Sequence, residues 1–330
     1  MAHLLDFMQN GNAAMAYVGA VPWHGLGQQL TAGASIDEWR VQAGLDWEVH
    51  RSPVFYHQNA DFDFGNRKYA KRHVLFRSDT HTELSVVSKD YKIHQPEEVL
   101  SFFDEISRIG GFELETAGVL KNGEKIWGLA KVDDGVEVVD GDRTRPYLLL
   151  ATSYDGTLAT TARFTSIRVV CNNTLQLASA DSSSQGIVKV PHSRSFDSEK
   201  LRKDLGIFKD SWERFQTEMR VLSRKKMSLH EAEAFTALLI GKRQTANPIT
   251  GKKSDIKDNR NFQKIMELFK GDALGYDMVG QTAYGMLNAV TEWTDHYKGR
   301  SVDTRLNAAW FGDGNALKQE AKEILYDFAS

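Results

Sequence analysis

Two tight-turn signals near the middle of the chain constrain its fold more than any other feature. Asn122–Gly123 lies between "FELETAGVL" and "EKIWGLAKV", and Asp155–Gly156 lies between "RPYLLLATS" and "TLATTARFTSI". Asn-Gly and Asp-Gly pairs readily take up the positive φ angles of a two-residue hairpin turn. We therefore expect two consecutive antiparallel β-hairpins at the centre of the chain.

Further strands and several helices are expected around these hairpins. "WEVHRSPVFYH" alternates as a strand does, and "RKYAKRHVLFRSDTHTELSVVS" predicts two strands joined at "SDTHT". A helix is predicted from Pro96 to a stop at Gly110–Gly111, and a short one after Ser35. From residue 197 onward the pattern is helical, and Ser228 with Glu231 forms a capping box.

One more helix is predicted directly after the second hairpin, over residues 165–179. Five residues there share a helical face: Ile167, Val170, Cys171, Leu175 and Ala178. The expected fold class is α+β, with antiparallel β-hairpins and a packing helix in a β-β-β-α-like core, followed by a helical C-terminal half. We place a boundary near residue 185. Residues 1–185 then form a mixed β-rich domain with an N-terminal arm, and residues 186–330 form a helical region with a long basic loop at 241–260.

Composition limits the class of protein. The chain has 330 residues, of which 41% are hydrophobic and 26% charged, a profile typical of a globular protein. No stretch approaches the roughly 20 apolar residues of a membrane span, and no signal peptide is recognisable. The single cysteine excludes an internal disulfide and a metal cage made of cysteines alone. We therefore expect a reduced, cytoplasmic compartment and no membrane partner.

Two residues could carry nucleophilic or acid–base chemistry. Cys171 is preceded by Arg168, which could lower the pKa of a catalytic thiol, but its apolar neighbours favour a buried structural cysteine. His24 lies in the loop sequence "PWHGLG", where it could act as a base, but a lone histidine in a short loop favours a packed N-terminal arm. We assign no catalytic residue and keep an enzyme that uses His24 or Cys171 as an alternative.

The sequence indicates no cofactor and no metal site. "TGKKS" at 250–254 lacks the glycine spacing and the Ser or Thr that a phosphate loop requires, and no dinucleotide-binding glycine pattern follows a strand. The acidic residues near 133–142 lack the spacing of a calcium loop and fit a solvated hairpin end.

Positive charge gathers in the middle of an otherwise acidic chain. Residues 181–260 carry 17 Lys or Arg and 11 Asp or Glu, although the whole chain has a net charge of −3. Such a set can neutralise nucleic-acid phosphates, but it also fits a solvated loop. The candidate nucleic-acid-binding residues are Arg163, Arg168, Arg224, Lys225, Lys226, Lys242, Arg243, Lys252, Lys253, Lys257 and Arg260. Trp212, Phe215 and Tyr154 are candidate stacking platforms for bases.

Three segments resemble a known family. "MAYVGAVPWHGLGQQLTAGASIDEWRVQAGLDWEV", "SYDGTLATTARFTSIRVVCNNTL" and the C-terminal "LNAVTEWTDHY" with "RLNAAWFG" are similar to the phage/plasmid-like protein family, a domain of unknown function carried by phages, prophages and plasmids. This resemblance spans nearly the whole chain. It implies a mobile-element context in a bacterial cell and brings no catalytic residues with it.

The expected order of elements is also similar to that of the Redβ and Erf single-strand annealing proteins. That resemblance implies an oligomer that holds single-stranded DNA along a basic groove, which the predicted helix 165–179 would help to form, with Arg163 and Arg168 facing it.

Three functions are compatible with the sequence. The leading hypothesis is a homo-oligomeric, non-enzymatic protein that binds or anneals single-stranded DNA in recombination or replication. The first alternative is a host-defence antagonist or regulator that binds a host protein through its acidic surface. The second is the enzyme described above.

Overall fold

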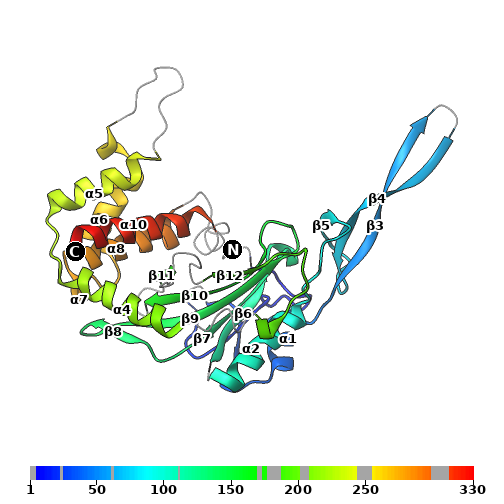
Figure 1. The fold of residues 1–330 in the computed structure, drawn as a ribbon, viewed down its shortest axis with the longest axis horizontal. Coiled ribbons are helices and arrows are strands. Elements are labelled where there is room, and N and C mark those ends of the chain that lie inside the picture. The colour runs from blue at the N-terminus through cyan, green and yellow to red at the C-terminus, as the bar shows by residue number, and fades with distance from the viewer. Residues whose placement is uncertain are drawn as a thin grey trace.

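The computed structural model describes residues 5–22, 25–60, 63–110, 112–168, 173–176, 187–200, 208–243, 255–298 and 312–330. A large twisted sheet lies at the centre of the molecule, and the C-terminal helices pack at one end of it (Figure 1). At the other end a long two-stranded hairpin projects away from the body (Figure 1). The α+β class and the concentration of helices in the C-terminal half are therefore confirmed.

The large sheet has the strand order β11-β10-β9-β7-β6-β1-β2, with β12 paired to β10 and β8 paired to β9. Its strands are β1 (Met15–Val18), β2 (Gln28–Leu30), β6 (Glu113–Leu120), β7 (Lys125–Lys131), β8 (Val136–Val139), β9 (Asp142–Ser153), β10 (Thr160–Arg168), β11 (Asn173–Gln176) and β12 (Ile187–Val190). All its pairs are antiparallel except β1 with β2. β12 follows the boundary predicted near residue 185 and still belongs to this sheet.

Both predicted central hairpins are confirmed. β6 and β7 are joined at Asn122–Gly123 through the 3₁₀ turn η1 (Lys121–Gly123), in which Asn122 has φ 56°. β9 and β10 are joined across Asp155–Gly156, where the Asp155 side chain accepts a hydrogen bond from the backbone N–H of Thr157. The turn chemistry therefore fixes the strand register within each of these two hairpins.

The predicted helix at 165–179 is wrong. β10 runs to Arg168 and pairs with β9 throughout residues 161–168, and β11 at 173–176 pairs back onto β10. A short apolar run cannot be assigned from spacing alone, and here the β-branched residues Thr165 and Ile167 extend an existing ladder. Cys171 and Val170 lie outside the described residues.

The helices mostly begin where the sequence predicts. The Ser35 side chain caps α1 (Ile36–Gln42), and Ser228 with Glu231 forms the predicted capping box at α5 (Leu229–Gly241). α2 (Pro96–Gly110) has the predicted bounds. The other described helices are α4 (Phe208–Arg224), α6 (Arg260–Glu267), α7 (Tyr276–Val279), α8 (Ala283–Glu292) and α10 (Asp313–Ala329), with the short turns η2 (Ile256–Asp258), η3 (Leu268–Asp272) and η4 (Trp293–Tyr297). The predicted loop 241–260 thus contains η2 and ends in α6, and residues 244–254 lie outside the described part.

One hydrophobic core lies between one face of the large sheet and the helices that pack on it, from α1 and α2 to the C-terminal helices. On β7, Ile126 and Ala130 belong to this core, whereas Trp127 and Leu129 belong to a smaller cluster on the opposite face. Helix α2 approaches β7 so closely that a Cβ atom on Gly128 would lie 2.4 Å from the ring of Phe103. The same core continues through α4, α8 and α10, so the sheet and the C-terminal helices are packed as one body.

Two buried ion pairs lock α10 onto the helices beside it. Lys318 Nζ lies 2.7 Å from Asp295 in η4, and Lys322 Nζ lies 2.7 Å from Glu218 on α4. All four side chains are nearly inaccessible to solvent. Burial lowers the pKa of Lys318, and the neighbouring Asp295 opposes that change. Because a buried charge without its partner is costly, these pairs restrict α10 to one position.

A buried pair of histidines ties the segment after β12 to the large sheet. The His94 Nε2 atom lies 2.9 Å from the carbonyl oxygen of Arg194, and His192 Nδ1 lies 2.9 Å from that of Lys92. The two rings lie 4.6 Å apart, and Tyr91 stacks on His192. Burial, with a contribution from the neighbouring His94, lowers the pKa of His192 below 6.5.

This lowered pKa makes stability depend on pH. The unfolded chain protonates residue 192 near pH 6.5, whereas the folded protein resists protonation until a lower pH. The contribution of His192 to the free energy of unfolding is therefore greatest above pH 6.5, where the imidazole is neutral in both states. This contribution decreases as the pH falls, because the unfolded state then binds the proton more readily. We expect His192→Gln to reduce the loss of unfolding free energy between pH 7.5 and pH 5.5, measured by urea denaturation. The exposed His230→Gln is the control, and equal slopes for the two variants would contradict this account.

Candidate nucleic-acid interface

The projecting hairpin is the most distinctive feature of the surface. It consists of β3 (Val49–Ala60) and β4 (Asp63–Arg77), and its inner part pairs with β5 (Glu83–Ser88) to form a separate three-stranded sheet. The register shifts between Pro53, which pairs with His73, and Val54, which pairs with Tyr69. We call residues 54–60 and 63–72, beyond and including this bulge, the β-arm. Figure 1 shows that it extends well past the body of the molecule.

Large aromatic side chains are exposed on the β-arm. The exposed fractions are 56% for Phe55, 49% for Tyr56 and 44% for Tyr69. Folded proteins rarely leave neighbouring large apolar groups in water unless the surface binds something. The exposed aromatic groups therefore make the β-arm a candidate contact surface.

Cations accompany these aromatic groups. Arg67, Lys68, Lys71 and Arg72 are all exposed, and residues 54–57 and 66–72 contain no Asp or Glu. This contrasts with the net charge of −3 for the whole chain. A local positive field on an acidic protein favours an anionic ligand at this place.

The strand pairing distributes the side chains over two faces of the β-arm. Tyr56 pairs with Arg67, and Tyr69 is two residues further along β4, so these three side chains share one face. Phe55 pairs with Lys68, and this pair lies on the opposite face. Each face therefore combines an aromatic ring with a cation directly across the ladder.

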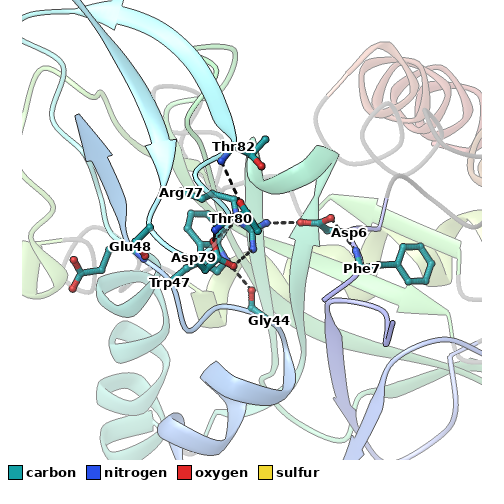
Figure 2. Close-up of polar contacts among 10 residues, drawn as sticks. Asp6, Phe7, Gly44, Trp47, Glu48, Arg77, Asp79, Thr80 and Thr82 are labelled. Atoms are coloured by element: carbon teal, nitrogen blue, oxygen red, sulfur yellow. Dashed lines mark hydrogen bonds and ion pairs between the residues drawn. The ribbon is translucent and has the colours of Figure 1, made fainter. Parts of the chain in front are cut away.

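A buried arginine fixes the base of the hairpin to the body. Figure 2 shows Arg77, the last residue of β4, between the carboxylates of Asp6 and Asp79. Its guanidinium lies 2.5 Å from Asp6, donates two hydrogen bonds of 2.9 and 2.7 Å to Asp79, and stacks 4.4 Å from the Trp47 ring. A Cβ atom on Gly123 would lie 2.8 Å from the Arg77 side chain, so the β6–β7 turn also packs here.

The two carboxylates beside Arg77 favour the charged state of its guanidinium. Burial by itself would lower the pKa of Arg77, but the hydrogen bonds and charges of Asp79 and Asp6 outweigh it and raise that pKa. The pKa of Asp79 is lowered by the same contacts, although burial opposes the change. At the start of β3, the Gln95 amide both accepts from the N–H of Val49 and donates to its carbonyl. Both strands of the hairpin are thus held at their base.

Replacing Arg77 should destabilise the fold. Arg77→Leu leaves two partly buried carboxylates without their cation, and we expect a loss of about 2–3 kcal/mol in unfolding free energy. Urea denaturation at pH 7 measures it. The control is Arg143→Leu, which removes only the exposed pair with Glu137 and should cost less than about 1 kcal/mol. Equal losses in the two variants would refute the role of Arg77 as an anchor.

Several predicted nucleic-acid-binding residues already have partners within the protein. Lys242 and Arg243 both contact Glu320, at 2.9 and 2.6 Å, and Lys257 lies 2.7 Å from Glu233. The Lys225 ammonium lies 4.6 Å above the ring of Phe328. These contacts within the protein weaken the four cations as phosphate ligands.

The remaining predicted residues lie in different environments. Arg163 is only 6% exposed on β10, and burial lowers its pKa to about 10, so it lies inside the protein. Arg168 pairs through its backbone with Thr144 and Asn173. Exposed positions are held by Arg224, Lys226 and Arg260, while Lys252, Lys253 and His24 lie outside the described residues.

The three predicted stacking platforms are core residues. Tyr154 is fully buried and donates a hydrogen bond from its hydroxyl to the carbonyl of His94. Trp212 and Phe215, both on α4, stack on each other within the core. The prediction that these rings could meet bases is wrong, because helical and sheet packing turns them inward.

The sequence contains a signal for the β-arm that composition alone does not reveal. In the strand segments "VFYH" and "NRKYAKR", aromatic or basic side chains occur at both odd and even positions, and therefore on both faces of the strand. A strand that covers a core alternates apolar with polar residues, so the absence of that alternation indicates a ribbon with both faces exposed.

Comparisons with known proteins give a family. Residues 83–310 match the family described as "Domain of unknown function (DUF932)". The chain belongs to this family. The DUF932 match begins at the first residue of β5 and includes β6–β12 and α4–α8, so the β-arm lies N-terminal to it. No curated protein and no solved structure matches the chain.

Two further searches of the described residues concern other classes of site. In the described ranges, no group of three or more His, Cys, Asp or Glu side chains is placed to hold a metal ion. Among the helices described above, none is long and apolar enough to span a bilayer.

Proposed function

We propose that this DUF932 protein binds nucleic acid through its β-arm, and that its ligand is single-stranded DNA. One observation carries the proposal: the β-arm exposes three aromatic rings and four cations, without a carboxylate among residues 54–57 and 66–72. Phosphates are bound by Lys and Arg in a way that does not depend on base sequence. Aromatic rings add stacking with bases.

The shape of the β-arm suits this role. A two-stranded ribbon that stands away from the body presents both of its faces to a strand that lies along it. The anchor at Arg77 holds the ribbon at its base, which reduces the conformational entropy that binding must overcome. Arg224, Lys226 and Arg260 on the helical body are exposed and could add phosphate contacts for a longer strand.

The biological setting is a proposal of its own. The resemblance to phage/plasmid-like proteins supports a mobile element in a bacterial cytoplasm. The similarity to single-strand annealing proteins supports a homo-oligomer that anneals strands in recombination or replication. The mass of the protein in solution, measured with and without single-stranded DNA, tests the oligomer. Recovery of a host protein in place of DNA would favour the alternative of a host-protein antagonist.

Removing the cations of the β-arm should weaken binding and its dependence on salt. For single strands, each phosphate contact adds about 0.7 to the slope of log affinity against log salt. Four contacts therefore predict affinity about 50-fold weaker at 200 mM than at 50 mM salt. In the variant with Arg67, Lys68, Lys71 and Arg72 changed to Ala, we expect the slope to fall by about 3. Fluorescence anisotropy with a labelled oligonucleotide measures both quantities.

The matched control removes the same charge elsewhere. Lys242, Arg243, Lys257 and Lys264 each contact a carboxylate within the protein, and their joint replacement by Ala should leave the slope nearly unchanged. Absence of binding by the wild-type protein at 50 mM salt would refute the proposal. An equal effect of the two quadruple variants would refute the assignment to the β-arm.

A further inference from the structure

The inference concerns which side chains of the β-arm select its ligand, and it rests on the proposed function. We propose that Tyr56 and Tyr69 make the β-arm selective for unpaired strands over duplexes, whereas the cations supply affinity for both. The two tyrosines lie on the same face, and both rings are exposed.

The spacing of the two tyrosines does not fit a duplex. Tyr56 lies opposite Arg67, so Tyr69 is its diagonal neighbour, and such diagonal positions lie about 7–8 Å apart. Successive bases in duplex DNA are about 3.4 Å apart along each strand. Two rings at twice that spacing can each stack on a base only when the bases have separated, as they do in an extended single strand.

Duplex DNA also offers these rings the wrong surface. Paired bases present their edges in the grooves, and their faces are covered by neighbouring bases. A two-stranded ribbon is narrow enough for a major groove, so a duplex can still meet the cations of the β-arm. The tyrosine rings would then contact base edges and backbone, and would gain little of the stacking energy available from a single strand.

The cations flank the rings where phosphates of a stacked strand would lie. Arg67 is directly across the ladder from Tyr56, and Lys71 and Arg72 follow Tyr69 in the bulge. All three are exposed. Because phosphate contacts carry no information about strandedness, the discrimination is left to the two rings.

The test compares single-stranded and duplex oligonucleotides of the same sequence. For Tyr56→Ala/Tyr69→Ala, we expect single-strand affinity to fall about 10- to 100-fold while duplex affinity changes less than about 3-fold. The salt slope should remain that of the wild type, because no charge is removed. Tyr56→Phe/Tyr69→Phe keeps both rings and should restore single-strand affinity to within about 3-fold.

The outcomes separate this inference from the proposed function. Equal losses on single strands and duplexes, or a Phe variant as weak as the Ala variant, would overturn the selectivity of the rings and leave nucleic-acid binding intact. Absence of binding by the wild-type protein to either ligand would overturn the proposed function itself. Val86→Ala, at an exposed position of β5 that pairs with β4 below the β-arm, is the control for general damage to this sheet, and circular dichroism checks that each variant is folded.

Discussion

The contact of Arg77 with Asp6, Asp79 and Trp47 is the interaction on which the proposed site depends. It brings together the N-terminal segment, the residues before β3 and the end of β4, which are far apart in the sequence. A projecting two-stranded ribbon is marginally stable by itself, so it needs support at its base. The ion pairs, the third strand β5 and the Gln95 contacts with Val49 supply that support. The β-arm can therefore leave its outer residues in water.

Buried polar contacts hold the body of the molecule together. The buried pairs of Lys318 with Asp295 and of Lys322 with Glu218 hold α10 in place, and the histidine pair holds the segment after β12. These polar groups are satisfied by one another within a continuous core. Under the proposed function, this body supplies stability and the projecting ribbon contacts the ligand.

Local rules predicted much of the fold from the sequence. Turn chemistry at Asn122–Gly123 and the capping box at Ser228 placed elements correctly, because both depend on a few adjacent residues. The helix predicted at 165–179 failed because ladder pairing with β9, a contact distant in sequence, decided the outcome. The site was harder to predict for the same reason. Charge counts could not show that Lys242, Arg243 and Lys257 would find carboxylates on other elements, or that Phe55 and Tyr56 would remain exposed.

The central claim is that the β-arm contacts nucleic acid directly. Amide hydrogen exchange of the wild-type protein, measured with and without a single-stranded oligonucleotide, tests this most directly. The account predicts slower exchange in peptides covering residues 54–72 when the oligonucleotide is bound, with little change in peptides from α5. Slower exchange in the helical half, with residues 54–72 unchanged, would contradict it.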